Sequence, residues 1–173
     1  MNTISFQYHK TKYGELVLGS FEEQLCLLDF RYRRMRKTVD KRLKKGLNAQ
    51  CVEQSSDIIE ETKKQLDEYF GMERRDFDIP LLTVGTDFQK RVWGALQEVP
   101  YGSTSTYLDL AKKIGDEKAV RAVARANGAN SIGIIIPCHR IVGSDGELVG
   151  YGGGVAVKKR LLRLEQNLFL NQA

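Results

Sequence analysis

Short apolar runs dominate the first part of the chain. Residues 16–18 and 25–28 are apolar, and the segment 19–24 that joins them is mostly polar. Runs of this length, separated by a short polar connection, are typical of two neighbouring strands. The pattern therefore predicts a β-hairpin within a strand-rich region that extends over residues 1–45.

The pattern then changes to a helical period. Ser55, Ser56 and Asp57 can cap a helix, and apolar side chains follow at three- and four-residue spacing as far as Phe70, next to Gly71. Residues 76–84 contain a proline and predict an extended linker. We place a domain boundary near residue 84, which divides the chain into domains 1–84 and 85–173.

The second domain opens with a helix signal. Thr86 and Gln89 have the spacing of a capping box, and Pro100 is expected to stop the helix that they begin. The apolar stripe of this helix consists of Phe88, Val92, Ala95 and Leu96, and Trp93 lies beside it.

Two further helices are predicted in close succession. Ser105 can cap the first, Gly115 can end it, and Asp116 can cap a second helix over residues 117–127. Two short helices separated by a tight glycine turn are typical of a helix-turn-helix. Helix pairs also pack together in proteins that bind no DNA, so both interpretations stay open at this point.

The second of these helices carries cations and small residues. Arg121 and Arg125 are four residues apart and share one face. The small side chains that would let the helix approach another surface closely are Ala119, Ala122, Ala124 and Ala126.

A cysteine and a histidine stand side by side after an apolar run. Residues 134–136 are three isoleucines, which predict a buried strand, and Pro137, Cys138, His139 and Arg140 follow directly. A thiol reacts as its thiolate, which a nearby imidazole or cation favours. Successive side chains of an extended chain point apart, so a water could relay the proton. The alternative is that Cys138 is a buried small apolar residue.

The remaining segments combine glycine-rich turns with a last helix. Residues 143–146 have a turn composition, and residues 150–154 form a glycine-rich loop that could lie against a flat ligand. A helix is predicted from about residue 155 to 168. Glu165 lies in it, either as an exposed residue or as the carboxylate that orients His139.

Composition and charge narrow the class of protein. The 173 residues are 42% hydrophobic and 28% charged, with a net charge of +5. Residues 31–45 alone hold nine basic residues and one acidic residue, whereas residues 46–84 hold four and nine. A basic segment of this kind suits nucleic acid as a partner, although it is also compatible with a solvated charge run.

Cysteine use and hydropathy point to the cytoplasm. The three cysteines, Cys26, Cys51 and Cys138, are widely spaced and do not indicate a disulfide framework. No apolar run has the ~20 residues of a membrane helix, and the first residues lack a signal peptide pattern. A zinc site built from His9, Cys26 and Cys51 is a weaker alternative, because no local ligand motif supports it.

Several motifs together resemble the O6-alkylguanine-DNA alkyltransferases, the methylated-DNA–protein-cysteine methyltransferases. The resemblance covers roughly residues 85–168 and is specific, because its motifs agree in order and spacing. The motifs are residues 135–142 (IIPCHRIV), residues 150–154 (GYGGG), Lys158 with Leu161, Leu162 and Glu165, and upstream Phe88-Gln89, Val92-Trp93, Pro100-Tyr101-Gly102, Tyr107 and residues 119–123.

The resemblance implies a fold and a reaction. The expected fold is an α/β, ribonuclease-H-like N-terminal domain followed by a mostly helical, winged-helix-like C-terminal domain with a helix-turn-helix. The expected reaction is direct-reversal DNA repair, in which alkylated guanine is flipped out of duplex DNA and its O6-alkyl group passes irreversibly to a cysteine. Activity on O4-alkylthymine is left open. The transfer requires no metal or redox cofactor.

The resemblance also implies residue roles. Cys138 would accept the alkyl group, His139 would act as general base through a water, and Glu165 would fix the imidazole. Asn130 would be a hinge, and Tyr107 would rotate the 3′ phosphate and assist protonation of the leaving guanine. Arg121 would fill the gap left by the flipped base. Further DNA contacts are expected from Ala119, Ala122, Arg125 and Ser144, and the substrate pocket from Asn127, Pro137, Ile141, Tyr151, Gly152 and Gly153.

The partner implied is double-stranded DNA with alkylated guanine, bound through the minor groove by a monomer, with no membrane. The location implied is the cytoplasm, or the nucleus in a eukaryote.

Two residues depart from the pattern of the family. Asn127 stands where an apolar or sulfur-bearing residue is usual in this pocket, and Ser131 stands where proline is frequent. The alternatives are a non-catalytic alkyltransferase-like damage-binding protein, which typically carries tryptophan at the acceptor position, a sequence-specific regulator and a cysteine hydrolase.

Overall fold

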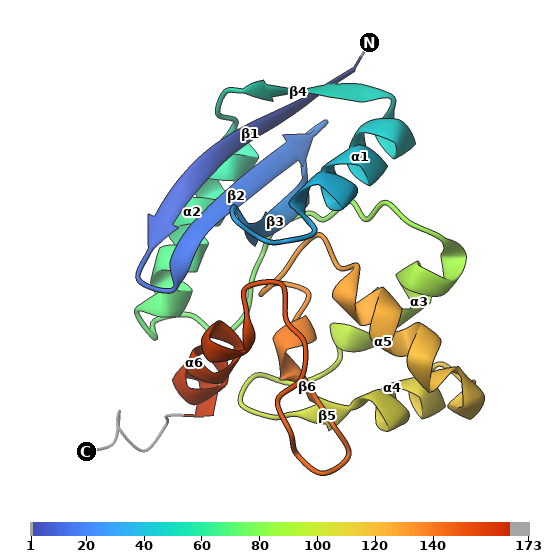
Figure 1. The fold of residues 1–173 in the computed structure, drawn as a ribbon. Coiled ribbons are helices and arrows are strands. Elements are labelled where there is room, and N and C mark those ends of the chain that lie inside the picture. The colour runs from blue at the N-terminus through green and yellow to red at the C-terminus, as the bar shows by residue number, and fades with distance from the viewer. Residues whose placement is uncertain (1, 167–173) are drawn as a thin grey trace. The chain divides into compact units, whose positions relative to one another are not determined.

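The protein divides into two compact units, Met1–Thr86 and Asp87–Ala173. The structure is a computed structural model that describes residues 2–166 (Figure 1). Each unit has its own secondary structure and its own apolar core. The sequence predicts a boundary near residue 84, two residues before the end of the first unit.

The first unit is built on a four-stranded sheet with the order β3-β2-β1-β4. Strands β1 (Asn2–Thr11), β2 (Gly14–Phe21) and β3 (Gln24–Phe30) are antiparallel neighbours, and β4 (Ala49–Glu53) runs parallel to β1. The predicted hairpin is confirmed as β2–β3. Its turn is shorter than residues 19–24, because only Glu22 and Glu23 lie between the strands, with φ of 48° and 65°. Positive φ at both positions matches the twist of a two-residue hairpin.

Two helices cover this sheet. Figure 1 shows α1 (Arg36–Leu47) in front of the sheet and α2 (Asp57–Phe70) behind it. Val39 and Leu43 of α1 join a core cluster with Ile4, Val17 and Leu27 of the strands. The helix predicted between residues 55–57 and Gly71 is confirmed as α2, and the Ser56 hydroxyl caps it by accepting a hydrogen bond from the Ile59 amide.

The linker after α2 is extended, as predicted, and pairs with the edge of β3. The Leu25 amide donates to the Pro80 carbonyl, and the Leu82 amide donates to the Leu25 carbonyl, both at 2.8 Å. These two bonds form a short parallel bridge that covers the sheet edge.

The second unit is mostly helical. Its helices are α3 (Asp87–Leu96), α4 (Tyr107–Lys113), α5 (Val120–Gly128) and α6 (Val155–Gln166). Two 3₁₀ turns, η1 (Glu117–Ala119) and η2 (Cys138–Arg140), and a parallel pair of two-residue strands, β5 (Ser105–Thr106) and β6 (Ile141–Val142), complete it. The indole of Trp93 is buried and donates to the Ala126 carbonyl at 2.8 Å, which joins α3 to α5. Residues 167–168 of the predicted last helix lie outside the described residues.

The helix-turn-helix forms as α4 and α5, with two corrections to its caps. Thr106, not Ser105, caps α4, because Ser105 and Thr106 are extended in β5 and the Thr106 hydroxyl accepts from the Asp109 amide at 3.0 Å. Asp116 makes no capping bond with its side chain, and the second helix begins with the turn η1 instead of a regular α-helical turn.

The predicted strand over residues 134–136 is wrong. The segment consists of turns, and the amide of Ile135 donates to the carbonyl of Gly133 at 2.7 Å. The residue between them, Ile134, has a φ of 68°, which a β-branched side chain rarely adopts. The apolar run is buried as expected, but its backbone partners are local and no neighbouring strand pairs with it within the described part.

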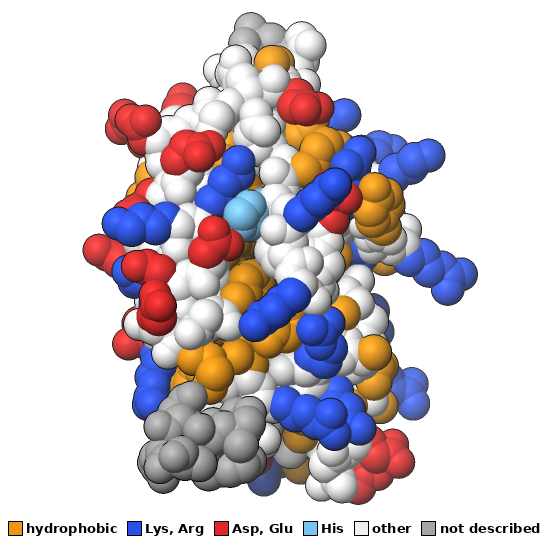
Figure 2. Space-filling model, turned by 90° about the vertical axis from the view of Figure 1, so that its left-hand side faces the viewer, with side chains coloured by type: hydrophobic (Ala, Val, Ile, Leu, Met, Phe, Trp, Pro, Cys, Tyr) orange, Lys and Arg blue, Asp and Glu red, His pale blue; other side chains and the backbone are white. Residues whose placement is uncertain are grey.

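Charge is unevenly distributed over the surface. On the face shown in Figure 2, acidic side chains gather toward the upper left, and Lys and Arg side chains gather on the right and at the bottom. The two helices of the first unit also differ in charge, since α1 carries six basic residues and α2 carries five acidic ones. No helix within residues 2–166 is long and apolar enough to cross a membrane.

Candidate active site

Cys138 stands at the start of a tight turn. Pro137 has φ −82° and ψ 63°, and the Cys138 amide donates to the Ile136 carbonyl at 2.8 Å, which together make an inverse γ-turn. The 3₁₀ turn η2 follows at once. Cys138 is 8% exposed. The local backbone therefore holds the thiol almost buried, with a small accessible area.

Asn130 holds the segment that leads to this turn. Its side-chain oxygen accepts from the Ile132 amide at 3.0 Å, and its side-chain nitrogen donates to the carbonyls of Ile136 at 2.8 Å and Ile132 at 3.3 Å. Asn130 is 3% exposed. One buried amide side chain thus joins the end of α5 to the residue before Pro137, and it supports the unusual backbone at Ile134.

His139, Glu165 and Arg140 form a buried ionic network. The distance from His139 Nε2 to Glu165 Oε2 is 2.7 Å. Arg140 donates to both oxygens of the same carboxylate, at 2.8 and 3.0 Å, and to the Val99 carbonyl at 2.7 Å. His139 and Glu165 are both 0% exposed. Glu165 is therefore not an exposed helix residue but a buried carboxylate in contact with His139.

The network sets the protonation of its members. Burial raises the pKa of Glu165, but the hydrogen bonds and charges of His139 and Arg140 outweigh it and lower that pKa to about 2. Burial lowers the pKa of His139, although Glu165 opposes this shift. The imidazole is then neutral at pH 7. Its Nε2 carries the proton and donates to the ionised carboxylate, which leaves the lone pair on Nδ1.

Tyr107 lies near the thiol and is hydrogen-bonded to Asn127. Burial raises the pKa of Tyr107, a negative charge on Cys138 raises it further, and a hydrogen bond with Asn127 opposes both. The phenol donates to the Val149 carbonyl at 3.3 Å. Tyr107 therefore stays protonated at neutral pH.

Lys158 belongs to the motif that carries the family resemblance, but the sequence gives it no role in the site. It is 0% exposed, and its ammonium donates to the carbonyls of Ile141 at 2.5 Å, Val149 at 2.9 Å and Gly150 at 3.4 Å. Burial lowers its pKa. The signal was its spacing, because position 158 falls on the same face of the helix as Leu161, Leu162 and Glu165.

Of the other predicted pocket residues, Tyr151 contacts His139, and Ile141 contacts Cys138 and Lys158. The rings of Tyr151 and His139 are edge to face, with centroids 6.4 Å apart, and Gly152 and Gly153 follow in the same half-buried loop. Ile141 is buried, and its carbonyl accepts from Lys158. The carbonyl of Cys138 accepts from the Ile141 amide.

The predicted DNA-contact residues lie on the surface of the second unit. Arg121 and Arg125 are exposed on α5, and Ala119 and Ala122 are half-buried beside them. Ser144 is exposed in the turn over residues 143–146, where the Gly146 amide donates to the Gly143 carbonyl. The arrangement separates an exposed cationic helix from a buried thiol and base.

The alternative zinc site does not form. His9 Nε2 lies 2.8 Å from the Asp67 carboxylate, and Cys26 donates to the Gly19 carbonyl. Within residues 2–166, no three or more His, Cys, Asp or Glu side chains are grouped so that they could hold a metal ion.

Comparison with known proteins places both units in one family. Residues 4–83 match the family "6-O-methylguanine DNA methyltransferase, ribonuclease-like domain", and residues 87–167 match "6-O-methylguanine DNA methyltransferase, DNA binding domain". A methylated-DNA–protein-cysteine methyltransferase of Methanosarcina barkeri is 44% identical over 154 residues, 89% of this chain and 92% of that protein. One of Methanosarcina acetivorans is 49% identical over 112 residues, 65% and 72% of the two chains.

A solved structure agrees with these matches. The crystal structure of Mycobacterium tuberculosis OGT in complex with DNA superposes with a TM-score of 0.81 at 37% identity, over 94% of this chain and 93% of that one. A ribonuclease-like α/β unit and a helical DNA-binding unit with a buried Cys-His-Glu arrangement thus occur here together. The chain belongs to the 6-O-methylguanine DNA methyltransferase family.

Proposed function

We propose that Cys138 is the residue to which this DNA-repair methyltransferase transfers the O6-alkyl group of guanine. The family membership makes the protein a direct-reversal repair enzyme. The observation that carries the assignment to Cys138 is the buried His139–Glu165 pair at 2.7 Å, because His139 directly follows Cys138 in the chain. Neither Cys26, which is buried with its pKa raised to about 12, nor Cys51 has such a neighbour in the described residues.

His139 is the base in this proposal. Because Nε2 is committed to Glu165, the lone pair on Nδ1 can take the thiol proton through one water. Glu165, ionised across the neutral range, stabilises the imidazolium that forms. The pairing resembles other sites in which a carboxylate orients the base of a nucleophile.

The transfer itself is a displacement at the alkyl carbon. The Cys138 sulfur forms a bond to that carbon while the carbon–O6 bond breaks, and the electron pair of that bond stays with guanine. The departing guanine takes up a proton, for which we propose Tyr107 as the donor, because its raised pKa keeps the hydroxyl protonated until the transfer. The thioether product has no leaving group that water can displace readily, so each molecule reacts once.

DNA binding is assigned to the helix-turn-helix of the second unit. In this proposal α5 enters the minor groove of alkylated duplex DNA, where half-buried Ala119 and Ala122 allow close approach and Arg125 contacts phosphate. Arg121 occupies the gap left by the flipped base, and Ser144 adds a contact from its turn. The pocket for the base is formed by Asn127, Pro137, Ile141, Tyr151, Gly152 and Gly153.

The proposal includes a monomer that works in the cytoplasm. A monomer suffices because the acceptor, its base and the exposed cations all come from one unit of one chain. None of the three cysteines forms a disulfide, which suits a reducing compartment. A damage-binding protein without transfer activity is disfavoured, because the curated relatives are named as methyltransferases and position 138 is a cysteine.

Active-site titration tests this function. Increasing amounts of protein are mixed with a duplex that contains one O6-methylguanine, and the repaired fraction is measured. We expect a linear rise that corresponds to one lesion per protein molecule, no repair by Cys138→Ser, and wild-type repair by the control Cys51→Ser. Repair of many lesions per molecule, or full repair by Cys138→Ser, would overturn the assignment.

A further inference from the structure

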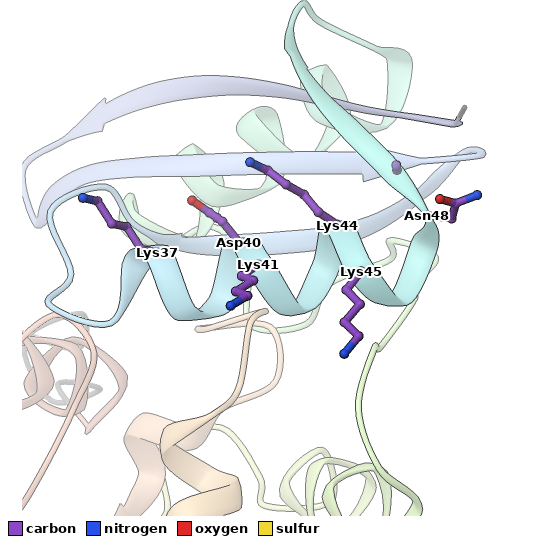
Figure 3. Close-up of a pocket in the computed structure, with 7 residues that line it drawn as sticks. Lys37, Asp40, Lys41, Lys44, Lys45 and Asn48 are labelled. Atoms are coloured by element: carbon purple, nitrogen blue, oxygen red, sulfur yellow. The ribbon is translucent and has the colours of Figure 1, made fainter.

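The N-terminal unit has a lysine-lined cavity outside the candidate active site. A surface cavity of about 450 Å³ lies along α1, lined by Lys37, Asp40, Lys41, Lys44, Lys45, Asn48 and Ala49. The four lysines are exposed. Figure 3 shows Lys37 and Lys44 pointing to one side of the helix and Lys41 and Lys45 to the other, so cations flank its outer surface in two rows. We call these four residues the α1 lysines.

Ion pairing within the unit does not account for the α1 lysines. The carboxylate in the cavity, Asp40, is bound by Arg36 at 2.8 Å, and Arg36 also contacts Asp29. None of the ion pairs between residues 2 and 166 includes an α1 lysine. Their charge is therefore left for a group from outside the chain.

The stability of α1 explains the presence of only two of the four α1 lysines. Cations are favourable at the C-terminus of a helix, which covers Lys44 and Lys45 in the last turn. The first turn of α1 has no acidic residue and instead holds Arg36 and Lys37, where a positive charge opposes the helix dipole. Arg36 is compensated by Asp29 and Asp40, but Lys37 is in no ion pair within residues 2–166 and thus lowers the stability of the helix, which is expected if it serves a ligand.

Further basic residues lie on α1 and next to it. Burial lowers the pKa of Arg42, and the neighbouring charges of Arg33 and Arg36 lower it further. Arg33 and Arg36 are compensated by Asp29 and Asp40, so an anionic ligand at the cavity would meet chiefly the α1 lysines, with Arg42 on the same helix.

The spacing of the α1 lysines fits a polymer better than a single anion. Positions 37, 41, 44 and 45 extend over about 12 Å of helix at ~1.5 Å per residue. One strand of a DNA duplex presents a phosphate every ~3.4 Å along its axis, so several phosphates fall within that length. Lysines bind phosphate as point charges and are depleted at protein–protein interfaces, which favours nucleic acid over a protein partner.

We propose that the α1 lysines form a second DNA-binding surface, which contacts backbone phosphates without reading the base sequence. That the polymer is DNA rests on the proposed function, because DNA is the substrate of the other unit. The surface adds charge-dependent affinity for undamaged duplex and takes no part in the chemistry at Cys138.

The salt dependence of DNA affinity tests this proposal. The full-length variant Lys37→Gln, Lys41→Gln, Lys44→Gln, Lys45→Gln is compared with wild type on a short undamaged duplex, between about 50 and 200 mM KCl. Each lost phosphate contact lowers the slope of log affinity against log salt by about 0.9. We expect a slope smaller by about 2 to 4, and an affinity at the low-salt end at least 10-fold weaker.

Two comparisons separate this surface from other effects. The matched control is Lys10→Gln, Lys12→Gln, Lys63→Gln, Lys64→Gln, which removes the same charge from the same unit and is expected to keep the wild-type slope to within about 1. Alkyl transfer from O6-benzylguanine as a free base reports on the chemistry alone, and the α1 variant is expected to react at the wild-type rate.

The outcomes are distinguishable. If wild-type protein reacts with the free base but the α1 variant keeps the wild-type salt slope, or loses no more slope than the control, the DNA-binding surface is refuted and the proposed function stands. If wild-type protein transfers no alkyl group from either the base or the duplex, the proposed function fails, whatever the salt slopes are.

Discussion

Glu165 is buried between a histidine and an arginine, and both depend on its charge. It contacts His139 at 2.7 Å and Arg140 through both oxygens. Removal of the carboxylate would leave the charge of Arg140, or of a protonated His139, buried without a counter-charge, and this would lower the stability of the protein. The same ionised group fixes the imidazole tautomer, so one residue serves both the stability and the chemistry of the site.

Substitution of Glu165 is the sharpest test of this arrangement. In Glu165→Gln the side chain keeps its shape but loses its charge, so it no longer stabilises an imidazolium at His139. We expect the single-turnover transfer rate to fall about 100-fold or more, the range that a general base supplies. The measurement is the rate of repair of an O6-methylguanine duplex with excess protein.

An exposed carboxylate provides the control for that substitution. Glu147 follows the turn over residues 143–146 and is exposed, so Glu147→Gln is expected to react at the wild-type rate. A folded Glu165→Gln protein that also repairs at the wild-type rate would contradict the role given to Glu165.

The connection between α4 and α5 depends on the backbone of one residue. Gly115 has a φ of 81°, its amide donates to the Lys112 carbonyl at 3.0 Å, and the next amide, of Asp116, donates to the Ala111 carbonyl at 2.9 Å. This pair of bonds is a Schellman motif, which a glycine at this position stabilises. The tight turn of the helix-turn-helix is thus built from a glycine in left-handed conformation.

Two glycine substitutions should therefore act in opposite directions. Gly115→Ala is expected to lower the free energy of unfolding by about 1 kcal/mol, because an L-residue is strained at that φ although no atom lies within 4 Å of the added carbon. Gly94→Ala, in the interior of α3 and equally uncrowded, is expected to raise it by about 0.5–1 kcal/mol. Urea unfolding of the two variants measures both, and equal effects would refute the argument from φ.

Local signals explain which elements the sequence could predict. The β2–β3 hairpin, α2 and the helix-turn-helix have periodic apolar residues and recognisable end residues within a few positions. Strand β4 has only five residues, of which three are exposed, and it pairs with β1 from a distance of more than 40 residues along the chain. Such pairing leaves little local pattern, and neither β1 nor β4 was predicted individually.

Side-chain contacts explain the errors at the site. The isoleucines at 134–136 have strand propensity, but the hydrogen bonds of Asn130 to Ile132 and Ile136 fold the segment into turns. The sequence alone gives Lys158 the character of a surface cation, because the three carbonyls that bind its ammonium are brought together only by the fold. Motif spacing indicated which residues belong to the site, whereas their contacts depend on the fold.

At the scale of the whole molecule, the two units carry different functional groups. The second unit holds the thiol, the base and the exposed arginines of α5. The first unit contributes a sheet with the lysine-lined helix α1 on one face, for which we propose a contact with DNA phosphates. Both units match domains of one family, so the chain as a whole is a repair methyltransferase whose acceptor we assign to Cys138.

Peptide mass after reaction with damaged DNA tests that assignment most directly. The protein is incubated with a duplex that contains O6-methylguanine, digested, and the mass of every cysteine-containing peptide is compared with that of unreacted protein. The account predicts one added methyl group, on the peptide that contains Cys138 and in a yield equal to the guanine repaired. A methyl group on the peptide of Cys26 or Cys51, or repaired guanine with no methylated peptide, would contradict it.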